Sequence, residues 1–267
     1  MKSTHPFARK RFGQNFLWSR TVIDEILSTA NPIEGEHVLE IGPGQGAITS
    51  KILERGASIT AVEIDRDLVK DLRRRFGNKI QFRIIEADIL NCEWHELVQT
   101  DRKNKIIANL PYNISTPLFF RIVRHRSYFD SITIMVQKEV AHRIRHTGQG
   151  KKLKDYGILS VIANTVFQTK QICEVSAGCF FPKPKVDSAV IRLIPKQVTI
   201  PDETAFFDFI KRAFNQRRKL FLSFLRKNEK ALMQKLSPDS IDQLTRLRPE
   251  NLSPADYYRL FHEHRIS

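Results

Sequence analysis

Short runs of apolar and β-branched residues alternate with amphipathic segments along the chain from residue 37 onward. This alternation is typical of a parallel β-sheet whose strands are joined by crossover helices. The pattern therefore predicts an α/β protein with a doubly wound sheet. The predicted strands are His37–Ile41, Ser58–Val62, Ile80–Ile85, Lys105–Ala108, Ser131–Val136 and a late strand at Ala189–Ile194.

The spacing of apolar residues also marks one crossover helix. Leu68, Leu72 and Phe76 recur at intervals of four residues and form a single apolar stripe. We therefore predict a helix that packs one face against the sheet.

The pattern changes after Pro195. No further β-rich run follows, and the stretch from Phe206 to Phe214 repeats aromatic residues with helical spacing. Ser253 before a proline is typical of a helix start, because serine can cap and proline is tolerated at the first helical position. We predict a sheet-containing domain over residues 1–198 and a small all-helical domain over residues 199–267.

Charge adds a candidate partner to this picture. The 267 residues include 44 Lys and Arg against 29 Asp and Glu, a net charge of +15, while 41% hydrophobic residues exclude a disordered basic tail. An excess of this size favours a polyanion, and clustering of the basic residues favours a phosphate backbone. The candidate phosphate-contacting residues are Arg9, Lys10, Arg11, Arg143, Arg145, Arg217, Arg218 and Lys219.

The cysteine and histidine pattern favours neither a disulfide framework nor a metal site. The three cysteines form no C-x-x-C pair, which indicates a reducing, cytoplasmic setting. His142 and His146 are four residues apart, but no third ligand accompanies them, so we expect no metal. No segment approaches about 18 consecutive apolar residues, so from the sequence we expect neither a membrane span nor a signal peptide.

The segment Glu40–Gly46 lies where the first predicted strand should turn into its helix. Gly42 and Gly44 would let a ligand approach the backbone closely there, and both are candidate cofactor contacts. The spacing is G-x-G-x-G, whereas the dinucleotide fingerprint is G-x-G-x-x-G. Taken alone, the segment leaves a nucleotide site and a tight turn equally open.

Acidic residues end the next two strands. Glu63 follows Gly42 by 21 positions, where an acid can accept both hydroxyls of a ribose. Asp88 ends the third strand and is placed to bind an adenine amine. Because the carboxyl ends of parallel strands meet at one edge of a sheet, these groups predict a cofactor site at that edge. They leave open whether the cofactor is a pyridine dinucleotide or S-adenosylmethionine.

The fourth strand ends in the sequence Asn109-Leu110-Pro111-Tyr112, which favours S-adenosylmethionine. An adenine amine is a poor nucleophile because its lone pair is delocalised into the ring. The side-chain oxygen of Asn109 and the carbonyl of Leu110, held rigid by Pro111, would accept the two amine hydrogens, while Tyr112 would stack on the base. The structural alternative is a Pro-Tyr turn capped by asparagine.

These motifs occur together in one family. The sequence closely resembles the bacterial ribosomal RNA adenine dimethyltransferases, which modify two adjacent adenines near the end of small-subunit rRNA. The resemblance runs over nearly the whole chain. It is carried by the segments 9–17, 38–49, 109–116, 136–141, 156–161, 180–188 and 214–219.

The resemblance implies a Rossmann-like methyltransferase sheet and assigns roles to particular residues. It implies that the basic segment 1–20 folds as a lid over the cofactor, and that Phe180, in an F-x-P-x-P-K-V motif, helps to hold the target adenine. Phe181 is the neighbouring candidate for that contact. The S-adenosylmethionine site implied by the resemblance consists of Asn15, Leu17, Gly42, Glu63, Asp88 and Asn109.

We therefore expect an S-adenosylmethionine-dependent enzyme that dimethylates the amines of two adjacent adenines in the 3′-terminal hairpin of 16S rRNA during 30S ribosome biogenesis. The expected partner is rRNA within a 30S assembly intermediate, and we expect a monomer. Two alternatives remain open from sequence. One is a DNA adenine methyltransferase, and the other is a ribosome-assembly binding factor whose catalysis is dispensable.

Overall fold

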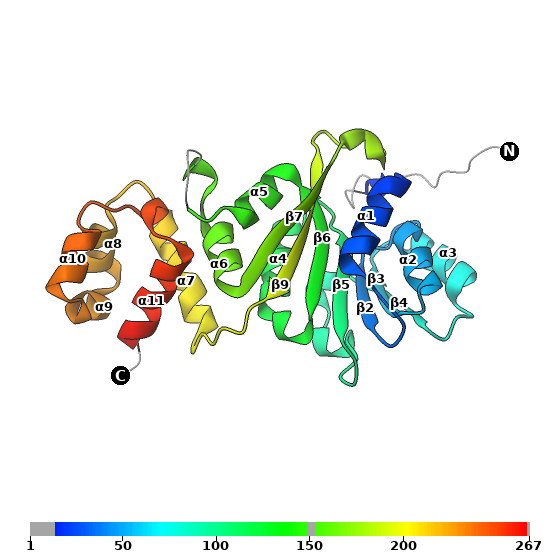
Figure 1. Cartoon of the computed structure of the whole chain (residues 1–267), viewed down its shortest axis with the longest axis horizontal. Coiled ribbons are helices and arrows are strands. Elements are labelled where there is room, and N and C mark those ends of the chain that lie inside the picture. The colour runs from blue at the N-terminus through cyan, green and yellow to red at the C-terminus, as the bar shows by residue number, and fades with distance from the viewer. Residues whose placement is uncertain (1–13, 149–152, 266–267) are drawn as a thin grey trace. The chain divides into compact units, whose positions relative to one another are not determined.

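A computed structural model describes residues 14–148 and 153–265 of the chain (Figure 1). The chain folds into two compact units. Unit 1 comprises residues 1–141 and 170–195, and unit 2 comprises residues 142–169 and 196–267. Unit 1 contains most of the sheet and the first four helices, and unit 2 contains the remaining helices from α6 onward.

The core of the fold is a seven-stranded sheet with the order β4-β3-β2-β5-β6-β9-β7. Strands β2 to β6 pair in parallel, and β9 runs antiparallel to β6. Because β2 lies between β3 and β5, the strand order reverses at β2, and a crevice for a ligand opens at such a switch point. The strands are β2 (His37–Ile41), β3 (Ser58–Glu63), β4 (Phe82–Glu86), β5 (Asn104–Asn109), β6 (Ser131–Gln137), β7 (Phe167–Val175) and β9 (Ser188–Pro195).

The helices confirm the α/β alternation expected from the sequence. In α3 the stripe of Leu68, Leu72 and Phe76 is buried, as the periodicity predicted, and α1 packs against β5, β6 and β9. The helices are α1 (Arg20–Ala30), α2 (Ala47–Glu54), α3 (Arg66–Phe76), α4 (Ser115–Arg124), α5 (Lys138–Arg145), α6 (Ile158–Val166), α7 (Glu203–Asn215), α8 (Phe221–Asn228), α9 (Lys230–Lys235), α10 (Pro238–Leu244) and α11 (Pro254–Arg265).

All six predicted strands are present, but three further strands were not predicted. Strand β7 lies at the edge of the sheet, so only its two end residues are buried and its middle is polar and lacks an apolar run. Strands β1 (Phe16–Leu17) and β8 (Phe180–Phe181) contain two residues each and pair antiparallel with one another. A strand of two residues is too short to show the alternation of apolar and polar side chains by which strands are predicted.

The compact units do not follow the predicted boundary at residue 198. Residues 142–169, which include α6, group with the C-terminal helices rather than with the sheet. Within unit 2, α6 packs against α7 and α11. The apolar face of α6 therefore belongs to the core of the helical unit, a tertiary contact that local sequence does not reveal. The assignment of cofactor and rRNA binding to separate domains stays a prediction.

Unit 2 is held together by aromatic side chains. Phe209 lies on α7, and its ring centroid is 5.9 Å from Phe224, 6.0 Å from Phe261 and 6.1 Å from Tyr257. The helix that carries Tyr257 and Phe261 is α11, which begins after Ser253 as predicted, with the Ser253 hydroxyl accepting the Asp256 N–H at 3.2 Å. The aromatic periodicity seen after Pro195 thus marks the core of this unit.

Unit 1 contains a buried polar contact across three central strands. His37 of β2 is fully buried; its Nδ1 is 2.8 Å from Asn104 Oδ1 in β5, and its Nε2 is 2.9 Å from Thr60 Oγ1 in β3. Burial lowers the pKa of His37 below its usual value of 6.5. The folded protein therefore favours neutral imidazole.

This burial predicts a loss of stability in acid. Above pH 6.5 His37 is neutral in both states, whereas below it the unfolded chain takes up a proton first, so the free energy of unfolding falls until the folded-state pKa is reached. We expect His37→Gln to be less stable than the wild-type protein at pH 7. Its melting temperature should fall less than that of the wild-type protein between pH 7 and pH 5. Thermal unfolding of both proteins across that range tests this, and equal losses would contradict it.

Candidate active site

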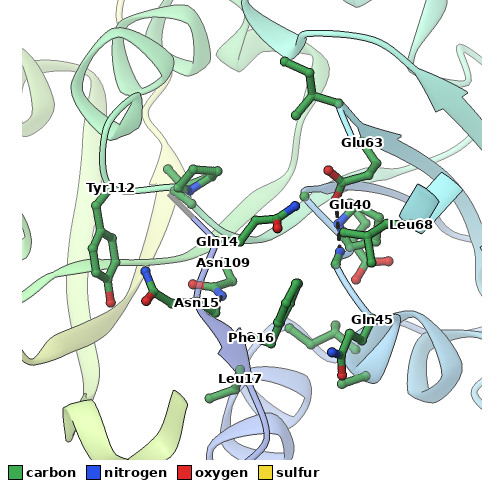
Figure 2. A pocket seen from close by; sticks show the side chains of 18 residues that line it. Gln14, Asn15, Phe16, Leu17, Glu40, Gln45, Glu63, Leu68, Asn109 and Tyr112 are labelled. Carbon is green, nitrogen blue, oxygen red and sulfur yellow. Dashed lines mark hydrogen bonds between the residues drawn. The ribbon is translucent and has the colours of Figure 1, made fainter. Parts of the chain in front are cut away.

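An open pocket lies at the carboxyl ends of β2, β3 and β5 within unit 1 (Figure 2). Its walls come from an N-terminal segment, the turn after β2, the end of β3 and the residues that follow β5. The lining residues are Gln14, Asn15, Phe16, Leu17, Glu40, Gly42, Pro43, Gly44, Gln45, Ala47, Ile48, Glu63, Ile64, Leu68, Asn109, Leu110, Pro111 and Tyr112. The pocket occupies the edge of the sheet that the sequence indicated.

The glycine turn after β2 is shaped by close packing. Gly42, Gly44 and Gly46 all have positive φ, the region that other residues rarely adopt. A Cβ on Gly46 would lie 2.7 Å from a methyl carbon of Leu72, and one on Gly44 would lie 3.1 Å from the Phe16 ring. The turn therefore needs glycine both for its backbone and to fit between α3 and the N-terminal segment.

Glu63 connects this turn to the end of β3. The Gly44 N–H donates to Glu63 Oε2 at 3.2 Å, and the Asp65 N–H donates to Glu63 Oε1 at 3.0 Å. Burial raises the pKa of Glu63 above its usual value, although these two backbone donors act in the opposite direction. The carboxylate is thus fixed at the pocket wall, where its remaining lone pairs suit the hydroxyls of a ribose.

Glu40 is a pocket residue to which the sequence analysis assigned no role. It lies inside β2 and is almost fully buried, and its Oε2 accepts the Thr49 hydroxyl at 2.7 Å. Burial, with a smaller contribution from the neighbouring Glu63, raises the pKa of Glu40 to about 8. An acid within an otherwise apolar strand was the signal that could have identified it, because an unpaired buried carboxyl is costly.

The residues after β5 face the N-terminal segment. Asn109 Nδ2 donates to the Asn15 carbonyl at 3.1 Å, so the Asn109 Oδ1 remains the acceptor of that amide. The Leu110 N–H donates to the Met135 carbonyl at 3.0 Å, which fixes the backbone next to Pro111. Figure 2 shows Asn109 and Asn15 close together between Tyr112 and Glu63.

Tyr112 is held through its hydroxyl. Its Oη lies 2.5 Å from Ser188 Oγ at the start of β9. Burial raises the pKa of the Tyr112 phenol, so the group stays protonated at neutral pH. The ring is therefore fixed at the pocket wall as a flat, uncharged surface.

The N-terminal segment is anchored at a further point that the sequence did not reveal. Gln14 Nε2 donates to Asp65 Oδ2 at 2.9 Å, and Asp65 caps α3 by accepting the Asp67 N–H at 3.0 Å. No local pattern connects Gln14 to a residue 51 positions away. Together with Asn15, it fixes the segment across the pocket.

Two of the predicted site residues do not line this pocket. Asp88 follows β4, and its carboxylate accepts the Leu90 N–H at 2.9 Å and the Asn91 amide at 3.4 Å. Phe180 packs in the core of unit 1 with 3% of its surface exposed, whereas the neighbouring Phe181 is 50% exposed. The burial of Phe180 conflicts with the prediction that it stacks on a base, because a base could reach its ring only after core residues had moved.

The described basic candidates all lie in unit 2, and Arg9, Lys10 and Arg11 lie outside the described residues. Arg143 is exposed and Arg145 is half-buried, both near the end of α5. Arg217 forms an ion pair with Glu250 at 2.5 Å and donates to the Lys154 carbonyl at 3.0 Å. Arg218 and Lys219 follow it, and both are exposed in the turn between α7 and α8.

The described part of the chain offers neither a metal cluster nor a membrane span. Among residues 14–148 and 153–265, no three His, Cys, Asp or Glu side chains are grouped so that they could hold a metal ion. Within the same ranges, no helix combines the length and apolar character needed to cross a bilayer.

Comparison with known proteins places this pocket in context. A family model described as ribosomal RNA adenine dimethylase matches residues 7–265. The ribosomal RNA small subunit methyltransferase A of Pseudomonas putida is 40% identical over 95% of this chain and 93% of its own length. The protein of the same name from Marinobacter nauticus is 42% identical over 95% of this chain and 90% of its own length.

Solved structures agree with this match. A dimethyladenosine transferase from Plasmodium falciparum has a TM-score of 0.77 and 26% identity, covering 93% of this chain and 96% of that one. The 23S rRNA methyltransferase ErmE shares the fold, with a TM-score of 0.69 and 23% identity over 94% of this chain and 99% of its own.

The sheet, its helices and the fold of these structural neighbours define a class I, Rossmann-like methyltransferase fold. Within that class the family match extends over nearly the whole chain, and the relatives are about as long as the chain itself. The chain therefore belongs to the ribosomal RNA adenine dimethylase family. This confirms the resemblance carried by the sequence motifs.

The pocket residues fit the methyl donor of this family. S-adenosylmethionine supplies an electrophilic methyl group on a positively charged sulfur when it is bound. The glycine turn permits close approach of a ligand to the backbone, and Glu63 presents a fixed acceptor for a ribose. Two buried acids, Glu40 and Glu63, also line the pocket, and their ionised forms suit a cationic ligand.

The raised pKa of Glu40 predicts that binding of this cation depends on pH. A positive ligand favours the carboxylate, so below about pH 8 binding must release a proton from Glu40. We expect the affinity for S-adenosylmethionine to rise with pH up to about 8 and then to level off. In Glu40→Gln this rise should be smaller, with Glu63 as the remaining buried acid. Protons that the ligand itself gains or loses affect both proteins equally and cancel in the comparison.

Calorimetric titration in two buffers of different ionisation enthalpy measures the proton release directly. The wild-type protein should release more protons at pH 7 than Glu40→Gln does. Equal release by both proteins would show that Glu40 does not ionise when the ligand binds.

Proposed function

We propose that this protein transfers methyl groups from S-adenosylmethionine to the N6 amines of two adjacent adenines in the 3′-terminal hairpin of small-subunit rRNA, within a 30S assembly intermediate. The observation that carries the proposal is the position of Asn109 and Tyr112 in the same pocket as the glycine turn and Glu63. Acceptors for an adenine amine thus share one pocket with groups suited to the methyl donor. Family membership supports rRNA adenine as the substrate.

Asn109 and Leu110 supply the chemistry of the acceptor side. The Asn109 Oδ1 and the Leu110 carbonyl would each accept one hydrogen of the adenine amine, which turns the nitrogen lone pair out of the ring. The rigidity that this requires is supported by the Asn109 hydrogen bond to Asn15 and by the Leu110 hydrogen bond to Met135. No strong general base is needed, because the amine proton becomes acidic once the nitrogen is alkylated.

Tyr112 would position the base. Its ring is fixed by the hydrogen bond to Ser188, and a fixed ring loses little entropy when a base stacks on it. The target adenine must leave its stack to reach the pocket, and an unpaired loop lowers that energy. Because one amine hydrogen remains after the first transfer, the same two acceptors must hold the monomethylated amine in a second orientation.

Unit 2 would bind the phosphate backbone of the RNA. The exposed Arg218 and Lys219 lie in the same compact unit as Arg143 and Arg145, although the two clusters are far apart in the sequence. Such contacts position RNA without reading its sequence. Arg217 is engaged by Glu250, so we assign it to holding the turn between α7 and α8. The proposal includes a monomer that acts in the cytoplasm, where ribosomes assemble.

We expect Asn109→Ala to lower methyl transfer by about 100-fold or more at saturating S-adenosylmethionine, because one of the two amine acceptors is lost. The measurement is incorporation of labelled methyl groups into 30S subunits from cells that lack the modification. Asn78→Ala, an exposed asparagine of the same unit, is the control and should keep full activity.

The same assay separates this function from its alternatives. Incorporation into duplex DNA but not into 30S subunits would indicate a DNA methyltransferase. Wild-type protein that binds 30S subunits without methylating them would indicate a binding factor. Undiminished transfer by Asn109→Ala would contradict the assigned role of Asn109.

We expect Arg218→Ala and Lys219→Ala each to weaken binding to RNA by a similar factor whatever the RNA sequence. Each lost phosphate contact should reduce the slope of log affinity against log salt by about 0.7 to 0.9. Lys230→Ala, an exposed lysine in the same unit, serves as the control. Filter binding at several salt concentrations measures the slopes. An unchanged slope in both variants would show that Arg218 and Lys219 do not bind phosphates of the RNA.

A further inference from the structure

The ladder between β1 and β8 divides four side chains between two faces. Phe16 pairs with Phe181, and Leu17 pairs with Phe180. Directly opposed residues in an antiparallel pair point to the same face, and successive residues alternate. Leu17 and Phe180 therefore share one face, and both belong to the core of unit 1. Phe16 and Phe181 share the other face.

The face that carries Phe16 and Phe181 adjoins the pocket and includes exposed aromatic surface. Phe16 lines the pocket, and Figure 2 shows its side chain and that of Leu17 leaving the segment on opposite sides. Phe181 is 50% exposed and Trp18, the next residue after β1, is 64% exposed. The Trp18 N–H donates to the Cys179 carbonyl at 3.1 Å, which continues the ladder by one residue. Two large rings are thus exposed, one on β8 and one at the residue that follows β1.

The segment between β8 and β9 adds positive charge beside these rings. Lys183 and Lys185 are both exposed on it. Its far end is anchored, because Asp187 Oδ1 accepts the N–H of residue 177 at 2.9 Å and Ser188 bonds to Tyr112 in the pocket. The two lysines therefore lie on a short connection between a pair of exposed rings and a wall of the pocket.

We propose that Trp18, Phe181, Lys183 and Lys185 form a platform for the unpaired nucleotides that flank the target adenine. Exposed rings that stack on bases, combined with cations that neutralise phosphates, are the features by which proteins hold single-stranded nucleic acid. The two lysines favour RNA over an apolar protein partner. The inference rests on the proposed function, since it is the methylated strand that the platform would hold.

This platform is distinct from the site of the target base. Phe181 and Trp18 do not line the pocket, whereas Tyr112 does. The target adenine would lie against Tyr112, and its neighbours in the strand would stack on the exposed rings. Of the two adjacent phenylalanines, it is the exposed Phe181 rather than the buried Phe180 that would stack on a flanking base.

Tryptophan fluorescence provides a direct test. The chain has two tryptophans, and Trp94 is completely buried, so quenching by added RNA reports on Trp18. The probe is a single-stranded RNA of about ten nucleotides, within the site size of such grooves. We expect saturable quenching that is lost in Trp18→Phe, with the affinity of Phe181→Ala weaker by about 5-fold to 150-fold.

The lysines are tested by the salt dependence of the same titration. Lys183→Ala and Lys185→Ala should each reduce the salt slope by about 0.7. The matched controls are Ile80→Ala, an apolar side chain that is 97% exposed, and Lys70→Ala, an exposed lysine on α3. Both controls should bind RNA as the wild-type protein does.

Several results would overturn the platform. They are an absence of Trp18 quenching by RNA, unchanged affinity in Phe181→Ala, or quenching that depends on protein concentration without RNA, which would indicate a second copy of the chain. Methyl transfer to 30S subunits by the wild-type protein tests the proposed function independently of the platform. Methyl transfer without Trp18 quenching would contradict the platform but not the proposed function. Trp18 quenching without methyl transfer would contradict the proposed methylation but not the platform.

Discussion

The burial of two carboxyl groups on adjacent parallel strands, Glu40 within β2 and Glu63 at the end of β3, is the constraint on which the site depends. Glu40 and Glu63 are both removed from water, and each is stabilised by a donor from the chain, Thr49 for the first and the Gly44 N–H for the second. An uncompensated buried acid is unfavourable, so the glycine turn and α2 must hold their positions around them. The same acids make the pocket a favourable environment for a positively charged ligand.

The N-terminal segment depends on this frame. Gln14 bonds to Asp65, which itself follows Glu63 at the end of β3, and Asn15 bonds to Asn109 at the end of β5. The segment therefore connects the pocket wall beside Glu63 to the wall that carries Asn109, the proposed amine acceptor. The side chain assigned to the adenine amine is also the one that anchors the segment, so cofactor and substrate contacts share one hydrogen-bonded unit.

The periodic pattern of apolar residues was sufficient to predict the strands and helices that alternate regularly along the chain. Six strands and the stripe of α3 follow from periodicity, and the pocket follows from the rule that parallel strands present their carboxyl ends at one edge. Periodicity could not reveal β7, whose edge position leaves polar residues exposed, or the grouping of α6 with the C-terminal helices. The motif assigned the base contact to Phe180, and only the β1–β8 register shows that this ring faces the core.

The charge of the protein and its chemistry are separated in the structure. The pocket is lined by acids, amides and apolar groups, whereas the described candidate RNA cations lie in unit 2, and Lys183 and Lys185 lie on an exposed segment of unit 1. A cation inside the pocket would repel a sulfonium, and an acid on the outer surface would repel phosphate. Among the residues that the structure describes, no Lys or Arg lines the pocket, so the net charge of +15 is compatible with a methyl-transfer site there. Under the proposed function, the cations that contact RNA phosphates and the neutral groups that accept the adenine amine are therefore different residues.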